Sequence, residues 1–198
     1  MIISTDTVSI TISVIPADNY NPRDYQLTLP VGSELSTDDF DIASVEIDRA
    51  GSKTRIAIVS ETPYDVDCAV LNGNVLSIVQ GFTIFHIDID TCILAGTTEI
   101  DSFCPNYSIY RIPEGYIIFG EMDITGLGAD FGFRWRFLGN DVFCPIEEGL
   151  KPIELCRDRI KLYDFNKDYY ELSYTGELIA HRKAKDKADK CGMGQTNY

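Results

Sequence analysis

The stretch IFHIDIDTCILA, residues 84–95, has a counterpart in YYELSYTGELIA, residues 169–180, which lies 85 positions later. Each copy consists of two short strand-like runs separated by a polar turn. A two-strand unit that recurs along a chain is typical of scaffolds built by duplication. Residues 116–137 fit the same pattern as a divergent copy. The repeat therefore predicts an all-β protein.

Strand and turn signals outside the repeat agree with this fold class. Residues 7–14 alternate apolar and hydroxylated side chains, which predicts a half-buried strand near the N-terminus. Asn72-Gly73 separates two apolar runs and predicts a type I′ hairpin turn, whose two central residues need positive φ. A second hairpin is expected across residues 113–115. Short strands with turn residues between them indicate antiparallel meanders.

The length of these meanders is typical of propeller blades. A propeller needs about four or more blades of roughly 40 residues each, whereas residues 55–180 supply about three. We therefore expect propeller-blade-like repeats in an open (incomplete) propeller or a sandwich, with a capping N-terminal sheet. No linker interrupts residues 1–180, which predicts a single all-β domain. Residues 181–198 are rich in lysine and predict a short, charged, flexible tail.

The charge of the chain restricts its partners. It has 31 acidic and 17 basic residues, a formal net charge of −14. Binding to nucleic acid or to an anionic membrane requires clustered Lys and Arg, so the charge argues against both. It favours a cationic partner such as a basic protein, a metal, or simple solubility. The sequence shows no signal peptide and no apolar run near the roughly 20 residues of a membrane helix, which predicts a cytoplasmic protein.

Three acidic segments also contain aromatic or apolar side chains, and they are candidates for a partner-binding surface. Tyrosine supplies contact area at such surfaces and carboxylates supply attraction. The alternative for each segment is an ordinary solvated face, since carboxylates are mostly exposed. The candidate residues are Asp38, Asp39, Phe40, Asp41, Glu61, Tyr64, Asp65, Asp67, Glu121 and Asp123, together with Tyr107 and Tyr110.

His86, Asp88 and Asp90 occupy alternate positions of a predicted strand, so their side chains are expected on one face. An imidazole with two carboxylates could form a metal site or an acid–base pair, and a carboxylate- or metal-dependent hydrolase is the alternative function. The competing interpretation is a solvated outer face. Because no further ligand is recognisable nearby, we predict no catalytic residue, no metal and no cofactor.

An aromatic strand is expected between residues 125 and 140. Phe131, Phe133, Trp135 and Phe137 lie at alternate positions, which places four aromatic rings on one face. The burial preference of such side chains favours a core strand. An exposed aromatic binding face is the alternative.

The C-terminal part of the chain also carries a resemblance to a known family, over residues 130–180. Its residues are Trp135-Arg136-Phe137, Asp141, Phe143, Ile160, Leu162, Asp164, Tyr169-Tyr170-Glu171-Leu172 and Gly176-Glu177-Leu178-Ile179. This strand spacing resembles the C-terminal half of small bacterial immunity proteins encoded beside contact-dependent inhibition or polymorphic toxins. The resemblance implies a cytosolic, non-enzymatic protein that binds a cognate toxin domain, and it assigns no functional residue.

Charge and resemblance together predict an immunity protein that neutralises a toxin, such as a nuclease, by occluding its basic active site. Nucleases attract phosphates, so an inhibitor gains by presenting carboxylates in the same places. A structural module of a larger cell-surface or secretion assembly is a further alternative.

Overall fold

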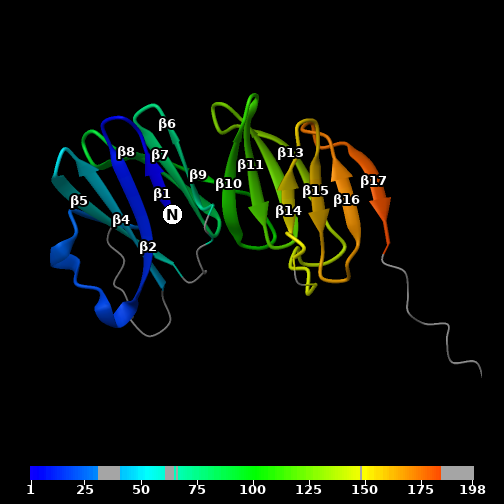
Figure 1. Cartoon of the computed structure of the whole chain (residues 1–198), viewed down its shortest axis with the longest axis horizontal. Coiled ribbons are helices and arrows are strands. Elements are labelled where there is room, and N and C mark those ends of the chain that lie inside the picture. Colours follow the sequence, from blue (N-terminus) through cyan, green and yellow to red (C-terminus); the bar gives the residue numbers. More distant parts are fainter. Residues whose placement is uncertain (31–40, 61–64, 66, 148, 184–198) are drawn as a thin grey trace, which may run out of the picture. The chain divides into compact units, whose positions relative to one another are not determined.

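The computed structural model describes residues 1–30, 41–60, 65, 67–147 and 149–183 (Figure 1). In this part of the chain the regular structure consists of strands and two short 3-10 helices, η1 (Ala17–Asn19) and η2 (Pro22–Asp24). None of the described helices is long and apolar enough to span a membrane. The chain divides into two compact units, an N-terminal unit (Met1–Leu138) and a C-terminal unit (Gly139–Tyr198).

The first sheet of the N-terminal unit has five strands in the order β1-β2-β4-β5-β3. They are β1 (Ile2–Ser4), β2 (Ser9–Pro16), β3 (Leu27–Leu29), β4 (Asp41–Arg49) and β5 (Ser52–Ser60). Its pairs are antiparallel except β3, which pairs parallel with β5. This parallel pair departs from the antiparallel prediction, because the 3-10 helices return the chain to the far edge of the sheet before β3.

Three four-stranded antiparallel meanders follow, each with its strands in sequence order (Figure 1). The first comprises β6 (Ala69–Asn72), β7 (Val75–Gln80), β8 (Thr83–Asp88) and β9 (Ile93–Glu99). The second comprises β10 (Asn106–Ile112), β11 (Gly115–Gly120), β12 (Asp123–Gly128) and β13 (Phe133–Leu138). The third, in the C-terminal unit, comprises β14 (Ile153–Leu155), β15 (Ile160–Tyr163), β16 (Tyr169–Leu172) and β17 (Leu178–Arg182). The all-β, blade-like meander prediction is confirmed.

The two sequence copies are equivalent hairpins, the third and fourth strands of their meanders. Pairing between β8 and β9 shifts register after His86, and pairing between β16 and β17 shifts after Glu171, the matching position of the repeat. The second meander has the same irregularity after Gly126. Each of these hairpins also has one turn residue with positive φ, namely Cys92, Phe131 or Gly176. The second meander therefore repeats the hairpin of the two sequence copies, and all three hairpins contain a β-bulge that the sequence did not predict.

The predicted hairpin at Asn72-Gly73 forms, but its turn lies one residue later. Asn72 pairs with Val75, so the central residues are Gly73 and Asn74. Of these two, Gly73 has a positive φ of 58° and Asn74 does not. This pattern fits a type II′ turn, which needs positive φ only at its first central position. The predicted type I′ turn is therefore wrong.

The main core of the N-terminal unit is shared by the first sheet and the two meanders beside it. Apolar side chains of residues 7–14 supply Val8, Ile10 and Ile12 to this core, as their alternation predicts. Val14 is 47% exposed and lies outside it. The opposite face of the first sheet has a smaller cluster, of Ile42, Ala57 and Val59. Burial of alternate side chains on both faces explains why these strands are rich in Ile and Val.

The predicted aromatic face of residues 131–137 is divided. Phe131 lies in the β12–β13 turn, outside the strand. Trp135 pairs with Gly126 whereas Phe133 pairs with the adjacent Leu127, so the bulge at Arg134 places the two rings on opposite faces. Phe133 is 62% exposed. The prediction of four aromatic rings on one face is therefore wrong.

The predicted limits of the domain (residues 1–180) and of the tail (residues 181–198) stay a prediction. The last strand, β17, extends past residue 180. β17 runs through His181 and Arg182, which the sequence analysis assigned to the tail. Their side chains contact the neighbouring strand β16: the His181 ring stacks on Tyr170, and the Arg182 guanidinium lies over the Tyr169 ring. Residues 184–198 lie outside the described residues.

Candidate functional site

The predicted partner-binding residues fall into two groups. Asp65, Asp67, Glu121 and Asp123 are described by the structure. Those outside the described residues are Asp38, Asp39, Phe40, Glu61 and Tyr64, and also the side chain of Asp41, whose backbone begins β4.

Asp65 and Asp67 lie beside β10, in the segment that joins β5 to β6. The Ser108 hydroxyl donates a hydrogen bond to the Asp65 carboxylate. The Tyr110 hydroxyl donates to Oδ2 of Asp67 over 3.4 Å, and the backbone N–H of Ile109 donates to the Asp67 carbonyl over 2.9 Å. These bonds bring together carboxylates and a tyrosine that are more than 40 residues apart in sequence.

The side chains of this cluster are graded in exposure. Asp67 is exposed, Asp65 and Tyr110 are half-buried, and Ser108 is buried. Burial, together with the nearby carboxylates, raises the pKa of Tyr110 to about 12. The phenol therefore keeps its proton and acts as a donor toward Asp67. We call Asp65, Asp67, Ser108 and Tyr110 the acidic–aromatic cluster.

Asp123 is not a surface residue, which corrects the sequence prediction. Its side chain has no solvent exposure, and the Ser102 hydroxyl lies 2.9 and 2.8 Å from its two carboxylate oxygens. Nε of Arg136 lies 3.5 Å from Oδ2. Burial raises the pKa of the Asp123 carboxyl. Glu121 is half-buried in the β11–β12 turn, where its N–H donates to the Pro105 carbonyl over 3.0 Å.

His86 does not lie on a simple solvated face. Nδ1 of its ring lies 2.9 Å from the Ser77 hydroxyl, and Nε2 lies 2.9 Å from the Thr98 hydroxyl. The Phe131 ring packs against the imidazole with centroids 4.4 Å apart. Burial lowers the pKa of His86, so the ring is held neutral between two hydroxyl groups.

Asp88 and Asp90 face partners different from those of His86. Oδ1 of Asp88 accepts hydrogen bonds from the N–H groups of Asp90 and Thr91, at 3.0 and 2.8 Å, which lowers the pKa of Asp88. Asp90 lies in the turn beyond the end of β8, so the prediction that all three side chains share a strand face is wrong. The described residues contain no group of three or more His, Cys, Asp or Glu arranged to hold a metal.

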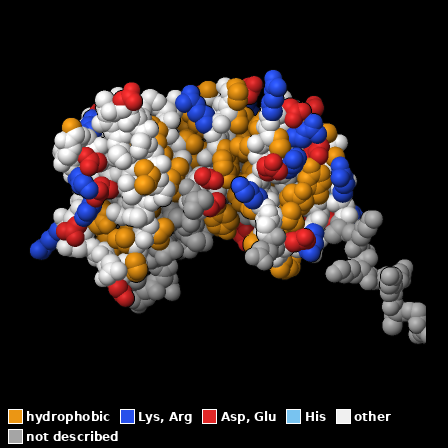
Figure 2. Space-filling model, in the orientation of Figure 1, with side chains coloured by type: hydrophobic (Ala, Val, Ile, Leu, Met, Phe, Trp, Pro, Cys, Tyr) orange, Lys and Arg blue, Asp and Glu red, His pale blue; other side chains and the backbone are white. Residues whose placement is uncertain are grey.

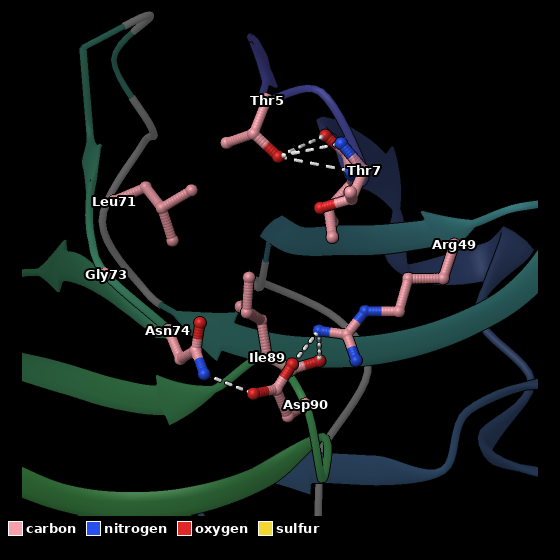
Figure 3. Close-up of a pocket in the computed structure, with 9 residues that line it drawn as sticks. Thr5, Thr7, Arg49, Leu71, Gly73, Asn74, Ile89 and Asp90 are labelled. Carbon is pink, nitrogen blue, oxygen red and sulfur yellow. Dashed lines mark hydrogen bonds and ion pairs between the residues drawn. The ribbon is translucent and has the colours of Figure 1, made fainter.

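Asp90 instead forms one wall of a polar pocket of about 410 Å³ (Figure 3). Arg49 and Asn74 both point toward its carboxylate, Arg49 as an ion pair and Asn74 as a hydrogen-bond donor. Arg49 also donates to the carbonyl of Ile89 over 2.9 Å. These contacts link the β8–β9 turn to β4 of the first sheet. The cation and the anion of the pocket also neutralise each other.

A second pocket of the N-terminal unit, of about 270 Å³, lies between the first and second meanders. Its lining includes Ser77, His86 and Gly96 from the first meander and Tyr116 from the second, together with Phe131 of the β12–β13 turn. We call it the aromatic pocket. Sequence reasoning could not find it, because the pocket exists only where two meanders meet.

The C-terminal unit contains a buried polar network that the sequence analysis also missed. The Tyr170 hydroxyl donates to Oδ2 of Asp164 over 2.9 Å and accepts from the N–H of Asn140 over 3.2 Å. Burial first, and then the Asp164 hydrogen bond, raise the pKa of Tyr170 to about 12. His181 stacks on the Tyr170 ring at 4.6 Å, and its Nε2 lies 3.2 Å from Oδ2 of Asp168.

We expect Tyr170→Phe to destabilise the C-terminal unit by about 2 kcal/mol, since the change leaves an Asp164 oxygen and the Asn140 N–H without this partner. Urea unfolding followed by circular dichroism measures the effect. Tyr163→Phe is the matched control, because no hydrogen bond of the Tyr163 hydroxyl is found within the described residues, and it should cost less than about 0.5 kcal/mol. Equal midpoints for the two variants would refute the network's role.

Charged side chains are interspersed on the face of the molecule in view, with red acidic and blue basic groups side by side (Figure 2). Ion pairs of this kind include Glu46 with Lys53 and Arg55, at 2.6 and 2.9 Å. The net charge therefore does not form one continuous acidic field on that face. Attraction of a basic partner to that face therefore depends on particular carboxylates.

Comparison with known proteins gives little beyond this geometry. No family model and no curated protein matches the chain. Among solved structures 101 chains match, one of which is the crystal structure of BamB from Moraxella catarrhalis, with a TM-score of 0.45 and 10% sequence identity. The match covers 74% of this chain and 48% of that one, so the chain spans about half the length of the BamB chain. This likeness carries no functional argument.

Proposed function

We propose that the chain is a cytoplasmic immunity protein, which binds a basic toxin domain and covers its active site. The observation that carries the proposal is the acidic–aromatic cluster. It places an exposed carboxylate, Asp67, beside a tyrosine that keeps its proton. Tyrosine is enriched among residues that dominate binding energy, and carboxylates accelerate encounter with a positively charged surface.

The cluster is suited to a partner whose active site attracts phosphates. A nuclease must present Lys and Arg to its substrate, and the same groups attract carboxylates. The Ser108 hydroxyl holds the Asp65 carboxylate and the Tyr110 hydroxyl holds the Asp67 carboxylate through hydrogen bonds, so less side-chain freedom is lost on binding. The charge of −14 adds long-range attraction to the same partner.

The proposal is tested with the purified toxin domain encoded by the adjacent gene. We expect Asp65→Asn with Asp67→Asn to lower the association rate constant by about 10-fold or more at low salt, with a smaller change in the dissociation rate. The asparagines can still accept the Ser108 and Tyr110 hydrogen bonds, so folding should be retained. Stopped-flow or surface-binding kinetics at low and high salt measure both rates.

A double variant elsewhere provides the matched control. Asp18 and Asp24 are exposed carboxylates of η1 and η2, and changing both to Asn alters the net charge by the same amount. If the control slows association as much as the cluster variant, the attraction is a general charge effect and the cluster is not the binding site. If the neighbouring toxin domain does not bind at all, the immunity function is wrong.

A further inference from the structure

The aromatic pocket contains an unusual backbone position at Phe131. Its φ is +61°, in the left-handed region that a bulky side chain rarely adopts. The equivalent hairpin turns of the first and third meanders have Cys92, with a φ of 55°, and Gly176, with a φ of 85°, so a positive φ is common to the three meanders. In the second meander a phenylalanine is held there instead. Strained positions of this kind cluster at ligand-binding sites, where the surrounding structure maintains them.

The conformation of Phe131 directs its ring into the pocket. The ring stacks on Tyr116 with centroids 4.3 Å apart and planes 10° from parallel, and it also contacts His86. Tyr116 is 2% exposed and Phe131 is half-buried, so the stacked pair forms a rigid aromatic wall with one partly accessible ring. The hydroxyl of Tyr116 accepts a hydrogen bond from the Asn72 amide over 3.2 Å.

Opposite the aromatic wall the pocket has open space. Gly96 pairs with His86 across β8 and β9 and therefore lies on the same sheet face. A Cβ added at Gly96 would meet no heavy atom within 4 Å, and the backbone there does not have a left-handed φ. The volume of about 270 Å³ is below the roughly 300–1,000 Å³ of pockets for drug-sized ligands, so a single side chain is the better match.

Within the described residues, the lining of the pocket carries no group that would repel a cation. No Lys or Arg is among the described residues that line it, and His86 is neutral because burial lowers its pKa. Asn72 and Tyr116 contribute oxygen acceptors.

We propose that the aromatic pocket binds the guanidinium group of an arginine side chain presented by the protein partner. This inference rests on the proposed function, because it names the group by which a basic partner would be anchored. Arginine is planar, stacks on aromatic rings and donates several hydrogen bonds, which fits a wall of Phe131 and Tyr116 beside oxygen acceptors. The pocket thus supplies the specific contact, and the acidic–aromatic cluster supplies attraction.

The direct test uses Nα-acetyl-arginine methylamide as the probe, with the full-length protein and NMR detection. We expect saturable shifts of the His86, Gly96 and Phe131 signals, with an affinity on the order of millimolar for one side chain. The citrulline analogue has a similar shape without the charge and should bind about 10-fold more weakly or not at all. Equal or tighter binding of citrulline or of a phenylalanine analogue, or no saturable shift with arginine, would overturn the proposal.

A pair of variants tests whether the arginine probe binds in this pocket. Gly96→Val should weaken arginine-probe binding at least about 10-fold, because the new side chain fills the open space of the pocket. The fold should be retained, since a strand position tolerates a β-branched side chain. Thr97→Val, an exposed neighbour on the opposite face of β9, is the control and should bind as the unmodified protein does. Thermal unfolding of both variants verifies the fold. Unchanged probe binding by Gly96→Val contradicts the assignment.

The two proposals fail in distinguishable ways. If the neighbouring toxin domain binds Gly96→Val as tightly as it binds the unmodified protein, the pocket is not the anchor, while the immunity function stands. If the arginine probe binds and Gly96→Val abolishes it, but no toxin domain binds, the pocket is an arginine site and the immunity function is wrong.

Discussion

Alanine in place of Gly115 is expected to destabilise the N-terminal unit by more than about 3 kcal/mol. Gly115 begins β11 with a φ of +151°, which other residues rarely adopt. A Cβ there would lie 2.1 Å from the backbone carbonyl oxygen of Leu127 and 2.6 Å from the carbonyl carbon of Gly128. Because both atoms belong to the backbone of β12, no rotamer change can relieve the clash, and the strands have to separate.

Urea unfolding measures this effect, with Trp135 as the probe. It is the only tryptophan of the chain and pairs with Gly126 in the same sheet, so its fluorescence reports on the second meander. Gly96→Ala is the matched control, since its Cβ meets nothing and the change should alter stability by no more than about 1 kcal/mol, in the stabilising direction. Coincident unfolding midpoints for the two alanine variants would show that the β11–β12 contact is not as tight as described.

Removal of the Asp123 carboxylate is the second large effect: we expect Asp123→Ala to lower the free energy of unfolding by about 3 kcal/mol. The change leaves the Ser102 hydroxyl with only the Cys104 carbonyl, 2.7 Å away, as an acceptor, and it leaves Arg136, whose side chain is 20% exposed, without its buried anion. Nε of Arg136 already has no hydrogen-bond partner in the described residues, and neither have Oδ1 of Asn106 and Oγ1 of Thr125. Asp123→Asn keeps the shape and an acceptor for Ser102, so it should be more stable than Asp123→Ala.

The raised pKa of Asp123 adds a pH dependence to this comparison. In the folded state the pKa of the carboxyl lies above its ordinary value of 3.8. The contribution of this group to folding is therefore largest below pH 3.8. Stability falls as pH rises through the interval between the unfolded and folded pKa values, and becomes level above it. We therefore expect the stability of Asp123→Asn relative to the unmodified protein to increase with pH across that interval. Urea titrations at several pH values test this, and a difference that is flat with pH would mean that burial does not control the ionisation.

Much of the fold could be predicted because period-two patterns persist along the chain. Residues 84–95 and their repeat at 169–180 form equivalent hairpins with β-bulges at matching positions. The similarity of the two sequences therefore reflects the same backbone geometry. The parallel pairing of β3 with β5 could not be predicted, since a pairing across a long connection leaves no local signal. The bulge at Arg134 was also invisible, because an inserted residue changes the face of a side chain without changing the composition.

The candidate site was harder to predict for a physical reason. A carboxylate is normally exposed, and only the approach of Ser102 and Arg136 from other segments makes a buried Asp123 tolerable. Pairing of Asp67 with Tyr110 had a signal in the sequence, since both types were expected at a binding surface. The contact of His86 with Phe131 had none, because it depends on how two meanders pack.

The sequential order of the meanders has a consequence for protein synthesis. Within each meander every strand pairs with its neighbour in the chain, so the last of the four strands to leave the ribosome completes the sheet. Short-range pairing of this kind has a small loop-closure cost and favours rapid folding. The N-terminal sheet differs, because β2 has to wait for β4 and β3 for β5. The first sheet can therefore be completed only after Ser60, the last residue of β5, has emerged.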